Sequence, residues 1–218
     1  CLYLNIWRPV NSGSEKLPIV VYLHGGSNKG GWAYEPNYHG EQLARHGVIV
    51  VSIAYRLNVF GLFAYPDQQV MNFGLMDQIA ALQWINQHAD AVGGEVGNIS
   101  LMGESAGGNN IGFLLASPLT DGLFNRVVIQ SAGSALKGRT TRDDLLQRTE
   151  LVATELLSNA HGSLEDLREI SASNMLKMVP KYYGNSFYFD PVVDGVALLQ
   201  LPRPSIEVSD KPPIDILV

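Results

Sequence analysis

One short stretch restricts the fold of this chain more than any other, namely residues 103–107 with the sequence G-E-S-A-G. It follows the apolar run Ile99–Met102 and has the G-x-S-x-G pattern, in which a serine stands on a sharp turn between a strand and a helix. Such a turn strains the serine backbone and crowds its neighbours, and glycine relieves the crowding because it lacks a Cβ atom. The pattern therefore predicts a strand, a tight turn at Ser105 and a helix directly after it.

The helix expected after Ser105 indicates what the serine does. Backbone N–H groups at a helix N-terminus, together with the helix dipole, favour negative charge. The N–H group of Ala106 is then a natural donor to an oxyanion. A glycine-rich turn without any chemistry has the same local pattern, and the 22 glycines of the chain make accidental matches common. Patterns elsewhere in the chain are needed to distinguish a catalytic serine from a glycine-rich turn without chemistry.

Composition restricts the classes of function. The chain has 218 residues, of which 46% are hydrophobic and 17% are charged, as is typical of a globular protein with one or at most two domains. A net charge of −6 argues against a nucleic-acid partner, which would favour a basic face. No apolar run approaches the length of a membrane span. We expect neither a cofactor nor a bound metal.

The chain begins at Cys1 without a methionine, so we expect that it is processed or incomplete. The absence of a signal segment here then carries no information on secretion. Cys1 is the only cysteine and has no partner within the chain. It is a buried thiol, a reactive thiol or one half of a disulfide with a residue outside the chain.

Apolar periodicity divides the chain into alternating strands and helices. Strands are predicted at Leu2–Trp7, Ile19–Leu23, Val48–Ala54, Ile99–Met102, Arg126–Gln130 and Ile214–Val218. Helices are predicted after Ser105 and at Glu41–His46, Leu75–Ala89, Thr140–Leu157, Leu164–Ile170 and Asn174–Val179. This alternation favours a mostly parallel α/β sheet with helices on both faces. The run Ile19–Leu23 is continuously apolar, so we expect this strand to be buried on both faces.

A second glycine-rich segment, H-G-G-S at residues 24–27, follows the run Ile19–Leu23. Together with the serine turn it belongs to a series of blocks in fixed order: C-L-Y-L-N-I-W at 1–7, H-G-G at 24–26, Y-R at 55–56 with F-G at 60–61, G-L-M-D-Q at 74–78 with A-L-Q-W at 81–84, G-E-S-A-G-G at 103–108, I-Q-S at 129–131 and P-V-V-D-G at 191–195. In these blocks the chain resembles the type-B carboxylesterases, the group that includes cholinesterases and para-nitrobenzyl esterases. The resemblance implies a single partial domain of the α/β-hydrolase fold over residues 1–218, incomplete at both ends.

The resemblance assigns roles to four residues. Ser105 matches the nucleophile that forms an acyl-enzyme with a small-molecule ester. Gly26, Ser27 and Ala106 match the positions whose backbone N–H groups form the oxyanion hole. Many relatives have glycine or alanine at the position of Ser27. Because the donor is a backbone group, the oxyanion hole should survive this change if Ser27 adopts the required backbone angles.

Two further residues are candidates for the substrate pocket. Glu104 is expected near the pocket floor, where its charge would influence the site, although a buried structural carboxylate fits the sequence equally well. Trp32 is a candidate for the pocket wall, and simple packing of its loop is the alternative.

The sequence does not supply the rest of a catalytic triad in the expected order of serine, acid and histidine. Only His161 follows Ser105, in a segment that is typical of an exposed loop, and His24 is expected to be structural. Asp190 and Asp194 are acids of the right type, but the resemblance identifies Asp194 as a turn residue. We therefore expect the triad acid and histidine beyond Val218, and we expect the 218 residues alone to be inactive.

Other interpretations remain at this stage. Some proteins of this fold are non-catalytic adhesion or binding domains, and others are lipases or amidases. The resemblance also implies that Cys1 bridges to an upstream cysteine, which favours a secreted or endomembrane location, although a free cysteine is the alternative. The ester substrate and the oligomeric state are not determined by the sequence.

Overall fold

A computed structural model describes residues 2–10, 13, 15–66, 68–133, 137–157, 163–203 and 214–218. The expectations for Cys1 and His161 lie outside the described residues.

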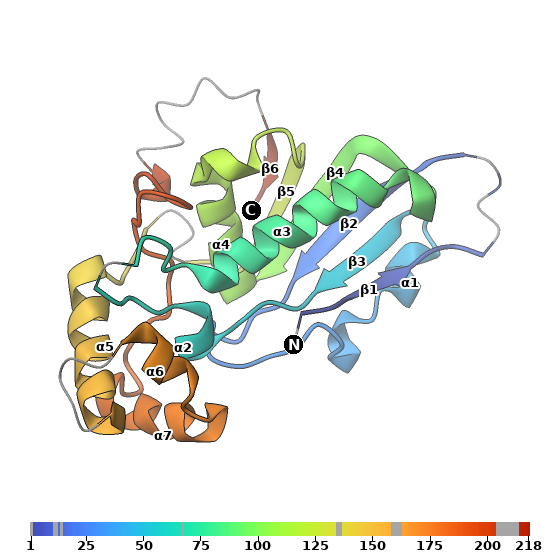
Figure 1. The fold of residues 1–218 in the computed structure, drawn as a ribbon. Helices are drawn as coiled ribbons and strands as arrows, with labels where there is room; N and C mark the ends of the chain where they lie inside the picture. The colour runs from blue at the N-terminus through green and yellow to red at the C-terminus, as the bar shows by residue number, and fades with distance from the viewer. Residues whose placement is uncertain are drawn as a thin grey trace.

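One sheet organises the described part of the chain, with the strand order β1-β3-β2-β4-β5-β6 (Figure 1). The strands are β1 (Leu4–Trp7), β2 (Leu17–Leu23), β3 (Ile49–Ile53), β4 (Gly94–Glu104), β5 (Arg126–Gln130) and β6 (Asp215–Leu217). β1 pairs with β3 in antiparallel orientation, and the other pairings are parallel. The prediction of a mostly parallel sheet is therefore confirmed, and β5 has the predicted bounds.

Helices alternate with the strands as predicted. They are α1 (Glu41–Ala44), α2 (Asn58–Gly61), α3 (Phe73–His88), α4 (Ala106–Ala116), α5 (Arg142–Leu157), α6 (Leu164–Arg168) and α7 (Ala172–Tyr182), with short 3-10 helices at Pro36–Tyr38, Asp90–Val92 and Pro118–Thr120. The prediction missed α2, which is a single turn and too short to show an apolar period. In the described ranges, no helix combines the length and the apolar character needed to cross a bilayer.

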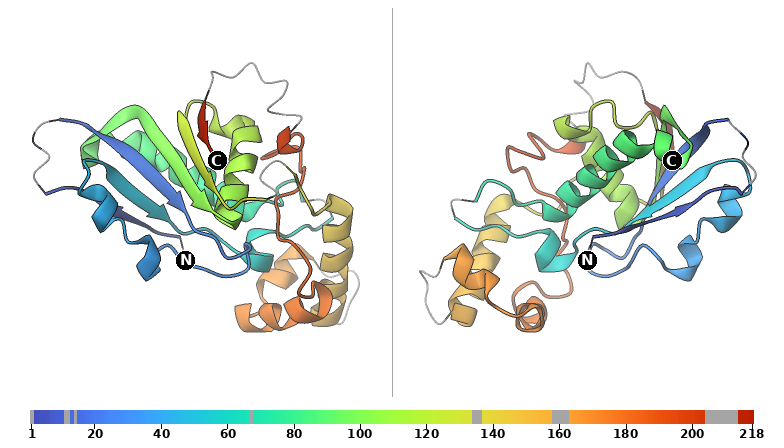
Figure 2. Two further views of the ribbon diagram at one scale, coloured as in Figure 1. Left: turned by 180° about the vertical axis from the view of Figure 1, so that it is seen from behind. Right: turned by 45° about the vertical axis from the view of Figure 1, so that its right-hand side comes forward.

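The two faces of the sheet differ in burial. Ile19 and Val21 of β2 stand level with Ile99 and Leu101 of β4, and all four are fully buried. They face α3 and α4, which cover this face of the sheet (Figures 1 and 2). The opposite face carries α1, which packs on β3. Helices therefore lie on both faces, but the coverage is unequal.

This difference corrects the prediction for Ile19–Leu23. The strand begins at Leu17, and its burial alternates instead of being complete on both faces. Val20 and Tyr22 point away from α3 and α4 and are only half-buried. An apolar run reports hydrophobicity, whereas burial also depends on what packs against each face.

A second apolar cluster lies beyond the carboxyl ends of the strands (Figures 1 and 2). It joins α5, α6 and α7 to the α2 region through buried side chains such as Val59, Leu145, Met175 and Phe189. The cluster therefore stands at the same end of the sheet as the turn that follows β4, which is where open α/β sheets bind ligands.

Two glycines enclose the carbonyl oxygen of Arg56 between α2 and α3. A Cβ atom added to Gly61 would lie 2.2 Å from this oxygen, and one added to Gly74 would lie 2.4 Å from it. The Arg56 guanidinium group also donates two hydrogen bonds to Asp77, at 2.8 and 2.7 Å. Two of the sequence blocks, 55–56 with 60–61 and 74–78 with 81–84, thus belong to one packed junction or to the helix that continues from it.

We predict that Gly74→Ala lowers the free energy of unfolding by about 1–3 kcal/mol or more, because the added methyl group overlaps the Arg56 carbonyl. Helix propensity alone gives the opposite sign, since alanine is better than glycine inside a helix by about 1 kcal/mol. Urea denaturation would measure the change. Gly133→Ala is the matched control, because no atom of the described residues, apart from its neighbours in the chain, lies within 4 Å of its added Cβ. An equal stability of Gly74→Ala and the parent protein would contradict the prediction.

Candidate functional site

Strand register brings the two glycine-rich segments together. β2 and β4 are neighbours, and Leu23 stands opposite Gly103. The residues that follow each strand therefore meet at the carboxyl edge of the sheet. The contact is close, because a Cβ atom added to Gly25 would lie 3.3 Å from Cβ of Ser105.

Ser105 forms a strained turn between β4 and α4. Its backbone angles are φ 54° and ψ −117°, which non-glycine residues rarely adopt. The turn is held on both sides, since the Ser105 N–H donates to Gln130 O at 2.9 Å and the Ser105 carbonyl accepts from Asn109 N at 2.9 Å. Ser105 is half-buried, so it is not enclosed by packing. The strand, turn and helix predicted from G-E-S-A-G are all present.

Each of the two glycines in the G-x-S-x-G pattern is required for a different steric reason. A Cβ atom on Gly103 would lie 2.6 Å from the Gly107 carbonyl carbon, so the strand and the helix that flank the turn pack backbone to backbone. A Cβ atom on Gly107 would lie 2.0 Å from Leu23 O, at the end of the neighbouring strand. Both contacts are with backbone atoms, which have little freedom to move away. Glycine at 103 is therefore required for α4 to pack against β4, and glycine at 107 is required for α4 to approach the end of β2.

The N-terminus of α4 lies directly after Ser105. The N–H groups of Ala106, Gly107 and Gly108 precede the first bond of the helix, which Asn109 N makes to Ser105 O. Ala106 is buried and every residue of α4 is buried. The amides and the helix dipole therefore create an environment beside Ser105 that favours an anion.

The segment 24–30, called here the glycine loop, turns sharply at the end of β2. Gly26, Ser27 and Asn28 have positive φ values of 100°, 58° and 55°. Gly26 O accepts hydrogen bonds from Lys29 N and Gly30 N, at 2.9 and 3.2 Å. Gly26 and Ser27 are exposed, whereas Asn28 is buried. Ser27 thus adopts a left-handed backbone conformation although it is not glycine.

His24 anchors the start of the glycine loop. It is 1% exposed, its ring stacks on Tyr55 with centroids 4.4 Å apart, and its Nδ1 donates to Gly25 O at 2.8 Å. The Tyr55 hydroxyl donates to His24 O at 2.6 Å. Burial lowers the pKa of His24 below its ordinary value of 6.5, although the bond to Gly25 and the charge of Glu35 oppose the shift. His24 is a neutral structural group, as expected.

None of the other described histidines is hydrogen-bonded to Ser105, and neither are the two candidate acids. His39 and His46 are exposed, and His88 bonds to Trp84 O. Asp190 is 3% exposed and forms two hydrogen bonds with the guanidinium group of Arg139, at 2.6 and 2.8 Å. Asp194 Oδ1 accepts from three successive backbone N–H groups, those of residues 196–198, which agrees with its predicted turn role. Among the described residues, no histidine forms a hydrogen bond with Ser105.

Glu104 and Trp32 have different surroundings. Glu104 is half-buried, and its Oε2 would lie 2.7 Å from a Cβ atom on Gly25. Its negative charge helps to raise the pKa of Tyr22 above 10.0, after the larger effects of burial and of Tyr38. Trp32 is 55% exposed and its backbone N–H donates to Glu35 Oε1 at 3.3 Å. Glu104 therefore lies next to Ser105 and below the glycine loop, and the role of Trp32 stays a prediction.

Sequence reasoning missed one polar pair. Asn28 and Asn110 are buried and hydrogen-bonded to each other across 82 positions of the sequence. A signal was available in α4, which is otherwise apolar or small but carries N-N at 109–110. Buried amides require hydrogen-bond partners, so this dipeptide indicated a polar contact without identifying the other residue.

Comparison with known proteins shows that the chain is similar to esterases. The sequence pattern of the Carboxylesterase family matches residues 1–218. The chain is 36% identical to para-nitrobenzyl esterase of Bacillus subtilis (strain 168), over 94% of this chain and 43% of that protein. It is 34% identical to liver carboxylesterase of Sus scrofa, over 96% of this chain and 40% of that protein. The chain therefore spans less than half the length of these relatives.

Solved structures agree with the sequence comparison. A structure of para-nitrobenzyl esterase superposes with a TM-score of 0.90 at 32% identity, covering 99% of this chain and 47% of that one. A carboxylesterase of Geobacillus stearothermophilus gives a TM-score of 0.82 at 35% identity, covering 94% and 45% of the two chains. The fold is thus the α/β-hydrolase fold, present here in part. The alternative of a non-catalytic adhesion domain gains no support from these relatives.

We predict that the free energy of unfolding falls as the pH decreases from about 7, because unfolding releases His24 into water, where it binds a proton more readily. The loss starts near the ordinary pKa of 6.5 and ends below the lowered pKa of the folded state. One such group contributes at most about 1.4 kcal/mol per pH unit. Urea denaturation at several pH values would show a smaller slope for His24→Gln than for the parent protein. Equal slopes would mean that His24 does not contribute.

Proposed function

This chain belongs to the carboxylesterase family, and we propose that the protein hydrolyses carboxylic esters through an acyl-enzyme on Ser105. One observation carries the proposal. Ser105 stands half-buried on a strained turn, between the N-terminus of α4 and the glycine loop that approaches it at Gly25. This arrangement offers a nucleophile and backbone donors to one carbonyl group.

The proposed first step is attack of Ser105 Oγ on the carbonyl carbon of the ester. The C=O π pair moves to the oxygen, and a general base takes the hydroxyl proton. The N–H groups of Gly26, Ser27 and Ala106 are the proposed donors to the resulting oxyanion. Each such donor contributes on the order of 10²–10³ in rate. The intermediate then expels the alcohol, which receives the proton, and water hydrolyses the acyl-enzyme by the same two steps.

The proton-transferring groups are proposed to come from residues beyond Val218. The relatives are more than twice as long as the matched segment, which leaves ample chain for them. This assignment is supported by the described histidines, none of which forms a hydrogen bond with Ser105. His24, for example, stacks on Tyr55 and donates to Gly25 O instead. Asp190 is likewise committed to Arg139.

Residues near Ser105 would shape the rest of the site. We propose that the Glu104 carboxylate, which lies beneath Gly25, favours positive charge on the histidine that takes the Ser105 proton. Trp32 remains a candidate for the wall of the substrate pocket. In the described part of the chain, no three His, Cys, Asp or Glu residues are grouped as metal ligands would be. The proposed mechanism needs only side chains, backbone amides and water.

The full-length protein is expected to hydrolyse a short acyl ester, and Ser105→Ala should lower kcat by roughly 10⁴-fold or more. A fluorophosphonate probe should label the parent protein at Ser105 and leave Ser105→Ala unlabelled. Ser100→Ala, which removes a half-buried serine of β4, the strand that precedes the turn, is the matched control and should retain both properties. A folded parent protein that neither turns over ester nor reacts with the probe would refute the proposal.

Residues 1–218 expressed alone are expected to be nearly inactive, at less than about a thousandth of the full-length rate, because removal of the base leaves only binding and the oxyanion donors. The measurement is ester turnover by the purified segment after circular dichroism has verified its fold. Rapid turnover that Ser105→Ala abolishes would place the base within these 218 residues.

A further inference from the structure

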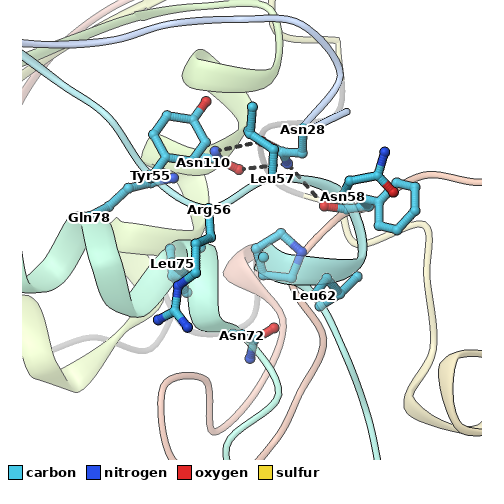
Figure 3. Close-up of a pocket in the computed structure, with 14 residues that line it drawn as sticks. Asn28, Tyr55, Arg56, Leu57, Asn58, Leu62, Asn72, Leu75, Gln78 and Asn110 are labelled. Carbon is cyan, nitrogen blue, oxygen red and sulfur yellow. Dashed lines mark hydrogen bonds between the residues drawn. The ribbon is translucent and has the colours of Figure 1, made fainter. Parts of the chain in front are cut away.

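Two buried asparagines connect the glycine loop to the helix that begins at Ser105. Asn28 Nδ2 donates to Asn110 Oδ1 at 3.1 Å, and Asn110 Nδ2 donates to Asn28 Oδ1 at 2.9 Å (Figure 3). The side chains are 7% and 2% exposed. A reciprocal amide pair of this kind satisfies a donor and an acceptor on each residue, and it fixes the two planes relative to each other.

The pair is important because its two residues lie in the two segments that carry the proposed oxyanion donors. Asn28 follows Ser27 directly, within the loop that carries two of the three proposed oxyanion donors. Asn110 lies five residues after Ser105 on α4, whose first amide is the third proposed donor. The pair therefore connects the two sources of donors side chain to side chain, in addition to the contact between the strands.

Asn28 makes further hydrogen bonds besides those with Asn110. Its Nδ2 also donates to Phe189 O at 3.0 Å, and its backbone carbonyl accepts from Asn58 N at 2.6 Å. Asn28, Asn58 and Asn110 line one cavity (Figure 3), and Phe189 is also part of its lining. One residue of the loop thus contacts α4, the start of α2 and the segment near the second apolar cluster.

The glycine loop needs such an anchor. Three consecutive residues, 26–28, have positive φ, and two of these are not glycine, so the backbone conformation is intrinsically unfavourable. Gly26 and Ser27 are exposed and contribute little packing. The loop is fixed at its start by the bond from Tyr55 to His24 O, and at its far side by Asn28. The proposed donors at 26 and 27 lie between these two anchors.

We propose that the Asn28–Asn110 pair is a positioning device that holds the N–H groups of Gly26 and Ser27 at the distance from Ser105 required by the oxyanion. This inference rests on the proposed function. Neither asparagine touches the reacting atoms, and both act through the backbone of the loop. Loss of the pair should therefore affect the transition state more than the binding of the ester.

The first test compares three variants of the full-length protein. Asn110→Ala removes the pair at a helical position that alanine favours, and Asn28→Gly removes it while retaining a residue that accepts positive φ. Each is expected to lower kcat by about 10- to 100-fold with KM changed by less than about threefold. The kcat of the double variant should lie within about twofold of that of Asn28→Gly, because Asn110→Ala then has no pair left to break.

Asn86→Ala is the matched control. Asn86 is a half-buried asparagine on α3 whose Nδ2 donates to Leu82 O and Leu123 O, both at 2.9 Å, away from the loop. This variant should lower the melting temperature and leave kcat unchanged. If Asn86→Ala reduced kcat as much as Asn110→Ala does, the effect would be general destabilisation and the proposal would be wrong.

Amide hydrogen exchange gives a readout that does not depend on turnover. Asn110→Ala should speed exchange of the Lys29 and Gly30 amides, which donate to Gly26 O, by at least tenfold relative to the parent protein, and Asn86→Ala should not. Unchanged exchange, or a kcat within twofold of the parent value in both single variants, would overturn the inference. A parent protein without esterase activity would refute the proposed function alone, since the exchange experiment still decides whether the pair holds the loop.

Discussion

The backbone contact between Gly107 and the carbonyl group of Leu23 is the constraint on which the rest of the site depends. A Cβ atom at residue 107 would approach this oxygen to 2.0 Å, far inside any permitted contact, so only glycine allows α4 to approach the end of β2. The parallel register of β2 and β4 then places Gly25 against Ser105. The glycine loop and the serine are thus brought together by contacts between backbone atoms, without the help of side-chain interactions.

The packing of the sheet extends the same argument. One row of buried side chains, which includes Ile19, Val21, Leu101 and Val127, packs under α3 and α4 and fixes the register of the central strands. A slip of one residue would turn this row to the opposite face, where Val20 and Tyr22 are only half-buried. Because the two faces differ strongly in burial, a slip in register is unfavourable. The strand ends therefore stay aligned, and the geometry around Ser105 is maintained.

Sequence analysis predicted the parts of this structure that local pattern determines. The turn at Ser105 has its own signature, and β5 combines β-branched residues with clear boundaries, so both were predicted correctly. The burial of Ile19–Leu23 was predicted wrongly, because a run of apolar residues does not indicate what covers each face. Asn28 and Asn110 were not predicted to meet, because their contact spans 82 positions and has no local pattern. The donor role of Ala106 was inferred from its place at the start of the helix expected after Ser105, whereas the roles of Gly26 and Ser27 came from the resemblance.

In the glycine loop and the turn at Ser105, the residues with a strained backbone are also residues that hydrogen bonds hold in place. Ser27, Asn28 and Ser105 all have positive φ, and each such non-glycine residue costs on the order of 1–3 kcal/mol. These conformations persist because several independent bonds determine them, from Gln130 and Asn109 at Ser105 and from Asn110 at Asn28. A backbone held in this way keeps its N–H dipoles oriented before a substrate arrives, so that in the proposed mechanism an oxyanion would be stabilised without reorganisation of the protein. The strained residues are therefore also the residues at which orientation of the backbone would have the greatest effect on the proposed reaction.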